Sequence, residues 1–174
     1  MRVVKISAGL LMYSEENNKI NVFLVHPGGP YFSGKDSWGI PKGEIDFSNG
    51  ENKENLLKIA KREFEEETGL EAKAVNGFIS LGFLKRTGGK TVHVWAFKGN
   101  GKEKFLKSNY FELEWPEKSG DIKKFPESDD GKYFNMAMAQ RKIHKYQAGF
   151  LDRLKIELEK MPRSANNFTQ NKLV

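Results

Sequence analysis

The sequence has no cysteine among its 174 residues. Without thiols the chain cannot form disulfides, a cysteine-ligated Fe–S cluster or a thiolate zinc site. It also lacks any apolar run near the ~18 residues that a membrane-spanning helix needs. The apolar stretch at residues 8–13 is too short for a secretory signal. We therefore expect a cytoplasmic protein with no membrane partner, whose chemistry comes from oxygen and imidazole ligands and from charge.

What the chain does contain fits one globular domain. Its 13 Phe, 3 Trp and 5 Tyr argue against disorder, because disordered chains are poor in large apolar side chains. The 29 Lys and Arg exceed the 23 Asp and Glu, for a net charge of +6. This excess suits a polyanion such as a nucleotide, and it is equally compatible with an ordinary solvated surface. The lysines are scattered, so nucleic acid is not the expected partner, RNA 5′ ends excepted.

The order of periodic segments predicts a mixed α/β sandwich, because strands precede and follow one central helix. A hairpin is expected from residues 3–13 and 20–25, two further strands over 74–85 and 91–98, the central helix over 54–68 and a helical pair over 136–143 and 146–158. We expect one domain over residues 1–161 and a flexible tail over residues 162–174. Edge strands and aromatic residues would permit a homodimer without requiring one.

The central helix carries a cluster of carboxylates. At ~100° per residue, Glu63, Glu66 and Glu67 share an arc of roughly 100°, and Glu65 points almost the opposite way. Clustered acids beside an apolar stripe are the geometry that Mg²⁺ needs. A salt-bridged surface helix is the alternative, since opposite charges also recur at i,i+4, as in the pair Arg62 and Glu66.

A longer pattern includes these glutamates: Arg62-Glu63-Phe64-x-Glu66-Glu67-x-Gly69-Leu70, with Glu54 eight residues before Arg62. It resembles the second half of the Nudix box, G-x5-E-x7-R-E-U-x-E-E-x-G-U. The stretches Val25–Pro30, Trp38–Glu44 and Phe111–Pro116 further resemble a bacterial subgroup of MutT-like proteins. The resemblance implies the Nudix-type α/β/α sandwich with a mixed sheet.

One departure from the family pattern precedes the helix. The family's first glycine would fall at Ser48, whereas Gly43 lies eleven residues before Glu54. The loop therefore carries five extra residues, at about positions 47–51. This insertion leaves open how the loop wraps the site, and whether Glu44 or Glu51 takes part.

The resemblance also implies roles for the residues that match the box. Glu63, Glu66 and Glu67 would hold Mg²⁺ or Mn²⁺, helped by a backbone carbonyl at Gly43 or its neighbour. Arg62 would pair with one of these glutamates and fix its rotamer. Among them, Glu66 is preferred as the acceptor of a proton from water.

A fourth carboxylate is expected from outside the helix. Members of the family often place a distal catalytic glutamate at a spacing like that of Glu127, which lies six residues before Tyr133. Glu127 is therefore the candidate fourth ligand or water activator, and an ordinary loop carboxylate is its alternative.

Candidates for substrate contact are of two kinds. The basic ones would attract phosphates, and the aromatic ones would stack on a base, although solvated charges and core or sheet packing are the alternatives. They are Lys42, Arg86, His93, Trp38, Phe111 and Trp115. The polar-aromatic strip from Ser108 to Trp115 is the first candidate for recognising the non-phosphate part of a substrate.

These features together predict a divalent-metal-dependent hydrolase. It would cleave a phosphoanhydride bond in a nucleoside diphosphate linked to another moiety, with a dinucleoside polyphosphate preferred because Pro41-Lys42-Gly43 resembles the loop of those hydrolases. The alternatives are a nucleoside triphosphate pyrophosphatase, an RNA 5′ pyrophosphohydrolase and a non-catalytic module that senses a nucleotide.

Overall fold

The computed structural model describes residues 5–45 and 55–161. In chain order the elements are β1 (Ile6–Glu16), β2 (Lys19–Pro27), β3 (Lys42–Glu44), α1 (Leu56–Thr68), β4 (Ile79–Lys85), β5 (Thr91–Lys98), β6 (Tyr110–Glu114), β7 (Ile122–Pro126), β8 (Ser128–Asn135), α2 (Met136–Lys142), the 3₁₀ helix η3 (Lys145–Gln147) and α3 (Ala148–Lys160). The predicted insertion at 47–51, Glu54 and the tail at 162–174 lie outside the described residues.

The main sheet is mixed and is built around β1. Its strands follow the order β4-β5-β1-β2-β8, and β3 pairs with β1 as well. Strand β1 is parallel to β5 and antiparallel to β2 and β3. The first part of β1, at Ser7–Gly9, pairs with β3, and its last part, at Tyr13–Glu16, pairs with β2. This division leaves β3 beside the N-terminal half of β1.

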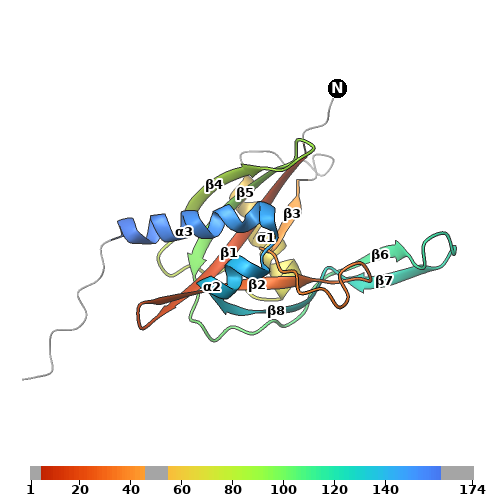
Figure 1. The fold of residues 1–174 in the computed structure, drawn as a ribbon, viewed down its shortest axis with the longest axis horizontal. Coiled ribbons are helices and arrows are strands. Elements are labelled where there is room, and N and C mark those ends of the chain that lie inside the picture. The colour runs from red at the N-terminus through yellow and green to blue at the C-terminus, as the bar shows by residue number, and fades with distance from the viewer. Residues whose placement is uncertain (1–4, 46–54, 162–174) are drawn as a thin grey trace, which may run out of the picture.

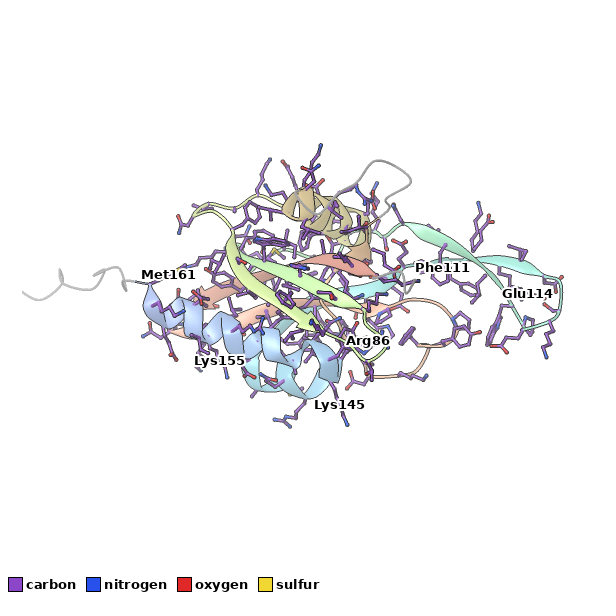
Figure 2. All side chains as sticks on the ribbon, turned by 90° about the horizontal axis from the view of Figure 1, so that it is seen from above. Arg86, Phe111, Glu114, Lys145, Lys155 and Met161 are labelled. Atoms are coloured by element: carbon purple, nitrogen blue, oxygen red, sulfur yellow. The ribbon has the colours of Figure 1, made fainter. Side chains whose placement is uncertain are left out.

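Helices cover both faces of this sheet (Figure 2). One buried cluster joins Ala8, Leu10 and Phe97 of the strands to α1. The other joins the opposite strand face, Leu11 and Val94 among it, to α2 and α3. Neighbouring residues of β1 and β5 alternate between the two clusters, as the period of a strand requires. The predicted α/β/α sandwich with a mixed sheet is confirmed.

Most of the predicted elements are present. The first hairpin turns at Asn17 and Asn18, whose φ angles of 50° and 60° are left-handed values that asparagine tolerates. Helix α1 ends at Gly69, whose φ is 73°. Strand β4 begins five residues later than expected, at Ile79. No helix in the described ranges is long and apolar enough to cross a membrane.

A two-stranded hairpin of β6 and β7 extends away from the main sheet (Figure 1). We did not predict it as a pair of strands. Its support comes from the loop after β2: the Tyr31 and Trp115 rings meet edge to face at 5.3 Å. A Cβ atom on Gly29 would approach the Phe111 ring at 3.0 Å. An isolated two-stranded hairpin is marginal in water, so these contacts stabilise it.

Candidate active site

Helix α1 carries its carboxylates at the border of its buried face. Phe64 is completely buried, and Glu63 beside it is only 9% exposed. Glu66 and Glu67 are partly exposed. Glu65 is exposed, and its Oε1 accepts a hydrogen bond from the Ala72 amide at 3.1 Å. The helix therefore separates Glu65 from the other three glutamates, as the angular positions predict.

The carboxylate of Glu63 lies directly over Gly43 of β3. A Cβ atom built on Gly43 would fall 1.9 Å from Cδ of Glu63 and 2.1 Å from its Oε2. No residue other than glycine leaves room for this side chain at its present position. Strand β3 and α1 therefore meet at Gly43 and Glu63, which brings the loop backbone predicted to assist metal binding next to a predicted ligand.

Arg62 connects two of the glutamates. Its guanidinium nitrogens lie 2.8 Å from Oε1 of Glu63 and 2.9 Å from Oε2 of Glu66. Because both contacts come from one planar group, Arg62 fixes the spacing of these carboxylates. The role of Arg62 in positioning a metal ligand stays a prediction.

Glu127 joins the carboxylates of α1 from a different part of the chain. It is the single residue between β7 and β8. Its backbone amide donates to the Asn109 carbonyl at 2.8 Å, and the Asn109 amide donates to the Glu66 carbonyl at 2.9 Å. The fold thus brings the distal carboxylate beside α1.

Burial and mutual repulsion favour the neutral form of these acids. Burial raises the pKa of Glu63 to about 7; Arg62 lowers it, and the charges of Glu66 and Glu127 raise it further. Burial raises the pKa of Glu67 to about 8, with Lys42 acting against the shift and Glu127 and Glu63 adding to it. Burial, and then the charge of Glu66, also raises the pKa of Glu127. Four acids are therefore electrostatically coupled in one place.

The chemistry of this donor set fits a hard divalent cation. Carboxylate oxygens are the ligands that Mg²⁺ and Mn²⁺ prefer, and a cation would relieve the repulsion that raises these pKa values. In residues 5–45 and 55–161, no three Asp, Glu or His side chains are already arranged to hold an ion. One carboxylate oxygen of Glu63 and one of Glu66 are paired with the guanidinium of Arg62.

Glu44 forms ion pairs with two lysines, which distinguishes its environment from that of the other acids. Glu44 pairs with Lys90 and, at 3.5 Å, with Lys5. Its hydrogen bond with Lys90 is the main cause that lowers the pKa of Glu44. Glu44 is therefore a charged, lysine-bound residue in contrast to Glu63 and Glu67.

Arg86 and His144 meet at the ring of Tyr146, which lies 5.8 Å from the His144 ring. Burial lowers the pKa of His144, and the charges of Lys42, Arg86 and His26 lower it further. The guanidinium of Arg86 lies 4.7 Å from the Tyr146 ring centroid. The charge of Lys42 acts on both Glu67 and His144.

The predicted stacking role of Trp38 is not supported by its position. Trp38 is 4% exposed. Its indole nitrogen donates to Oδ1 of Asp36 at 2.8 Å, and its ring meets Phe134 at 4.8 Å and His26 at 5.3 Å. Lys132 lies 4.5 Å from its ring centroid. Trp38 is a core residue, and no face of its ring is available to a base.

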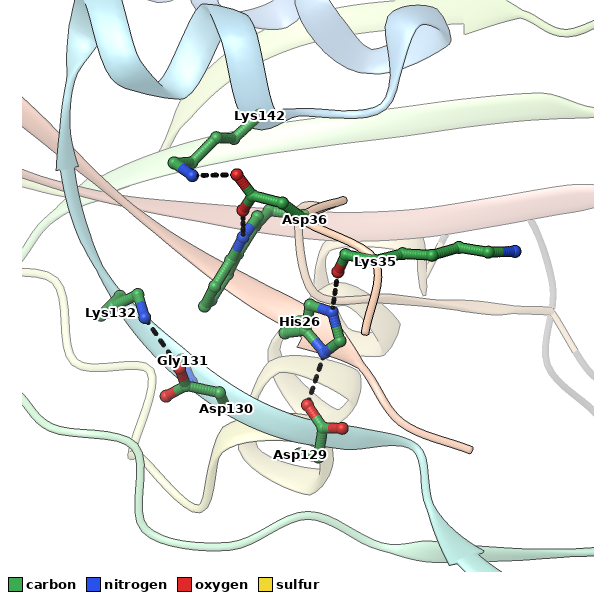
Figure 3. A network of polar contacts seen from close by, with 9 residues as sticks. His26, Lys35, Asp36, Asp129, Asp130, Gly131, Lys132 and Lys142 are labelled. Atoms are coloured by element: carbon green, nitrogen blue, oxygen red, sulfur yellow. Dashed lines mark hydrogen bonds and ion pairs between the residues drawn. The ribbon is translucent and has the colours of Figure 1, made fainter. Parts of the chain in front are cut away.

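His26 and Asp36 belong to a network of polar contacts (Figure 3). His26 connects two segments, because Nδ1 lies 2.6 Å from Oδ1 of Asp129 and Nε2 lies 2.6 Å from the Lys35 carbonyl. Asp36 also pairs with Lys142 of α2. The loop after β2 is thereby fixed to β8 and α2.

The remaining aromatic candidates lie in two places. His93 lies between the rings of Phe83, at 5.2 Å, and Trp95, at 6.4 Å. Phe111 and Trp115 belong to the β6–β7 hairpin, where Phe111 meets Phe125 at 6.1 Å. Figure 2 places Phe111 near the body of the molecule. Their roles in substrate binding stay predictions.

A comparison with protein families decides the assignment. The family model described as the NUDIX domain matches residues 4–154. The chain belongs to the Nudix family. No curated protein sequence matches it.

Solved structures agree with this fold. A Caenorhabditis elegans Ap4A hydrolase binary complex is similar at a TM-score of 0.60 and 22% identity, over 91% of this chain and 100% of that chain. The NUDIX domain of Shewanella oneidensis NrtR complexed with ADP ribose is similar at 0.60 and 13% identity, over 91% and 90%. The Nudix hydrolase RenU of M. smegmatis is similar at 0.59 and 18% identity, over 90% and 87%. These likenesses concern the Nudix fold.

Sequence reasoning missed two parts of this Nudix site. His144 falls between the helices predicted over 136–143 and 146–158, and Tyr146 was assigned only to the second of them, because no local motif marks either residue. Ser108 and Asn109 were assigned to substrate recognition, whereas their polar groups contact Ser128, Glu66 and Glu127. No local pattern marks either contact, because both depend on the tertiary fold.

Proposed function

We propose that this Nudix domain is a divalent-metal-dependent hydrolase that cleaves a phosphoanhydride bond in a nucleoside diphosphate linked to another moiety. The observation that carries the proposal is the convergence of Glu63, Glu66, Glu67 and Glu127 with raised pKa values for three of them. A set of buried like charges is costly unless a cation or a proton joins it. Such sets are typical of sites that bind a metal and move a proton.

The chain's own residues would divide the work. Glu63, Glu66 and Glu67 would hold Mg²⁺ or Mn²⁺, with a backbone carbonyl at Lys42 or Gly43. When bound, the ion would offset the negative charge of the diphosphate and acidify water. Glu66 or Glu127 would accept the proton of the attacking water, and the bond from phosphorus to the bridging oxygen would break. Arg62 would hold Glu63 and Glu66 at their spacing.

The basic group supports a substrate with a long phosphate chain. The charge of Lys42 acts on Glu67 and on His144, which lies with Arg86 at the Tyr146 ring. A phosphate chain that starts at the metal site would pass Lys42 and bring its distal phosphates to Arg86. Within the class, a dinucleoside polyphosphate is therefore the preferred substrate, ahead of a nucleoside triphosphate or an RNA 5′ end.

A sensing role is the second candidate. The NUDIX domain of NrtR was solved as a complex with ADP ribose, and its TM-score of 0.60 equals that of the Ap4A hydrolase complex, at 13% rather than 22% sequence identity. A module that binds a nucleotide without turnover would bind a ligand of this kind and leave it intact.

One substrate panel distinguishes these functions. Diadenosine tetraphosphate, ADP-ribose, a nucleotide sugar and ATP are each incubated with the protein and Mg²⁺, and products are resolved by chromatography. We expect fastest turnover of the dinucleoside polyphosphate, none in EDTA, and recovery with Mg²⁺ or Mn²⁺. Glu66→Gln should lower kcat by about 10²-fold or more. Glu65→Gln, on the opposite side of α1, is the matched control.

Two results would contradict the proposal. Persistence of turnover in EDTA would exclude the metal assignment. Binding of ADP-ribose with no hydrolysis of any compound in the panel would favour the sensing role.

A further inference from the structure

The segment between β5 and the β6–β7 hairpin is fixed to the end of α1. The amides of Leu106 and Lys107 donate to the Thr68 carbonyl at 3.0 and 3.3 Å, and the Asn109 amide donates to the Glu66 carbonyl at 2.9 Å. Backbone hydrogen bonds from residues 106–109 therefore hold this segment against the C-terminal end of α1.

The same segment fixes the backbone around Glu127. The Glu127 amide donates to the Asn109 carbonyl at 2.8 Å, and the Gly28 amide donates to the Glu127 carbonyl at 3.0 Å. The Ser128 amide donates to Oγ of Ser108 at 3.0 Å. Ser108 is 9% exposed and Ser128 is 2% exposed, so water does not readily replace this bond.

Among these hydrogen bonds, the one to Ser108 uses a side chain, and the others join backbone groups. Only this bond can therefore be removed by a substitution that leaves the backbone groups in place. Removing its hydroxyl would leave the buried Ser128 amide without that acceptor, and the backbone would shift to find another. The residue next to Ser128 is Glu127, so the shift would reach the distal carboxylate directly. Displacements of about 1 Å at a reacting group lower rates by up to about 10²-fold.

We propose that Ser108 is a positioning residue that holds Glu127 against the carboxylates of α1 by accepting the Ser128 amide hydrogen bond. The inference rests on the proposed hydrolase function, in which Glu127 accepts a proton or binds the ion. It replaces the substrate-recognition role that the sequence suggested for Ser108.

A double-mutant cycle on the full chain tests this role. Turnover of diadenosine tetraphosphate with Mg²⁺ is measured for the wild type, Ser108→Ala, Glu127→Gln and the double variant, and thermal unfolding confirms that each folds. We expect Ser108→Ala to lower kcat about tenfold with KM little changed, and to have no further effect in the Glu127→Gln background. Ser108→Cys, which keeps the size and weakens the acceptor, serves if the alanine variant does not fold.

Ser119→Ala is the matched control. Oγ of Ser119 also accepts a backbone amide, that of Asp121 at 3.1 Å, but at the far end of the same hairpin. We expect wild-type kcat for this variant.

The outcomes distinguish a failure of the positioning role of Ser108 from a failure of the proposed hydrolase function. Wild-type kcat in the Ser108 variants, or an equal loss with and without the Glu127 carboxylate, would overturn the positioning role and leave the hydrolase intact. Wild-type kcat in Glu127→Gln would also overturn it. If the wild type hydrolyses no compound in the substrate panel, the proposed function is overturned, and the positioning role with it.

Discussion

At the scale of single residues, the site depends on the contact between Gly43 and Glu63. The carboxylate occupies the volume that any side chain at position 43 would need. Glycine here serves a close approach of side chain to backbone rather than an unusual φ.

Gly43→Ala should therefore separate activity from stability. The added methyl group would displace the flexible end of Glu63, which costs little folding free energy but removes a proposed metal ligand. We expect kcat to fall by about 10²-fold or more with a small change in Tm. Gly34→Ala is a control for the loss of a glycine, since its Cβ meets nothing within 4 Å, although its φ of 75° adds strain. A fully active Gly43→Ala enzyme would contradict the assignment of Glu63.

The raised pKa of Glu67 predicts how stability without metal depends on pH. Burial raises the pKa of Glu67 in the folded chain to about 8, whereas the ordinary pKa of an exposed glutamate is 4.5. This group therefore favours the folded state fully below pH 4.5, and its contribution is lost as pH rises toward 8. Between pH 5 and 8 in EDTA, the Tm of Glu67→Gln should fall less than that of the wild type. Parallel declines would contradict the shift.

At the scale of elements, the sequence pattern predicted the helices and strands that carry a strong local signal. The asparagine turn of the first hairpin, the apolar stripe of α1 and the alternation in β5 each carry a signal within a few residues. Strand β3 has only three residues, Lys42–Glu44, and its pairing with β1 follows from the tertiary fold. In β7 the exposed Lys123 and Lys124 hide the strand period.

The far end of the β6–β7 hairpin should depend on the contact between Tyr31 and Trp115. Trp115→Ala removes the ring that meets Tyr31 at 5.3 Å, so the end of the hairpin should loosen while the main sheet persists. We expect faster limited proteolysis at residues 116–121 with little change in Tm. Tyr110→Ala, which alters a ring that is 68% exposed, is the control. Unchanged cleavage in Trp115→Ala would show that the hairpin is held by other contacts.

At the scale of the whole molecule, the site combines segments that are distant in sequence. The carboxylates come from α1 and the β7–β8 junction, and the basic residues come from β3, the β4–β5 turn and the segment after α2. The box on α1 was predictable because its residues are close in sequence. The proximity of Arg86 to His144 and Tyr146 could not be predicted, because Arg86 follows β4 and the other two follow α2, and only the tertiary fold brings these segments together. The homodimer stays a prediction.

Arg86 tests whether the basic group serves the substrate. Arg86→Ala should raise KM for a dinucleoside polyphosphate about tenfold and change kcat less, because the charge acts on distal phosphates rather than on the reacting bond. Lys85→Ala removes a neighbouring exposed charge and is the control. Unaltered KM in Arg86→Ala would place the distal phosphates elsewhere.

The most direct measurement of the central claim is a Mn²⁺ titration followed by electron paramagnetic resonance. Wild type, Glu67→Gln and Glu65→Gln are compared at the same pH and salt. If the glutamates on one side of α1 hold the ion, Glu67→Gln binds Mn²⁺ at least about tenfold more weakly and Glu65→Gln binds it as the wild type does. Equal Mn²⁺ affinity in all three proteins would contradict the metal site on α1.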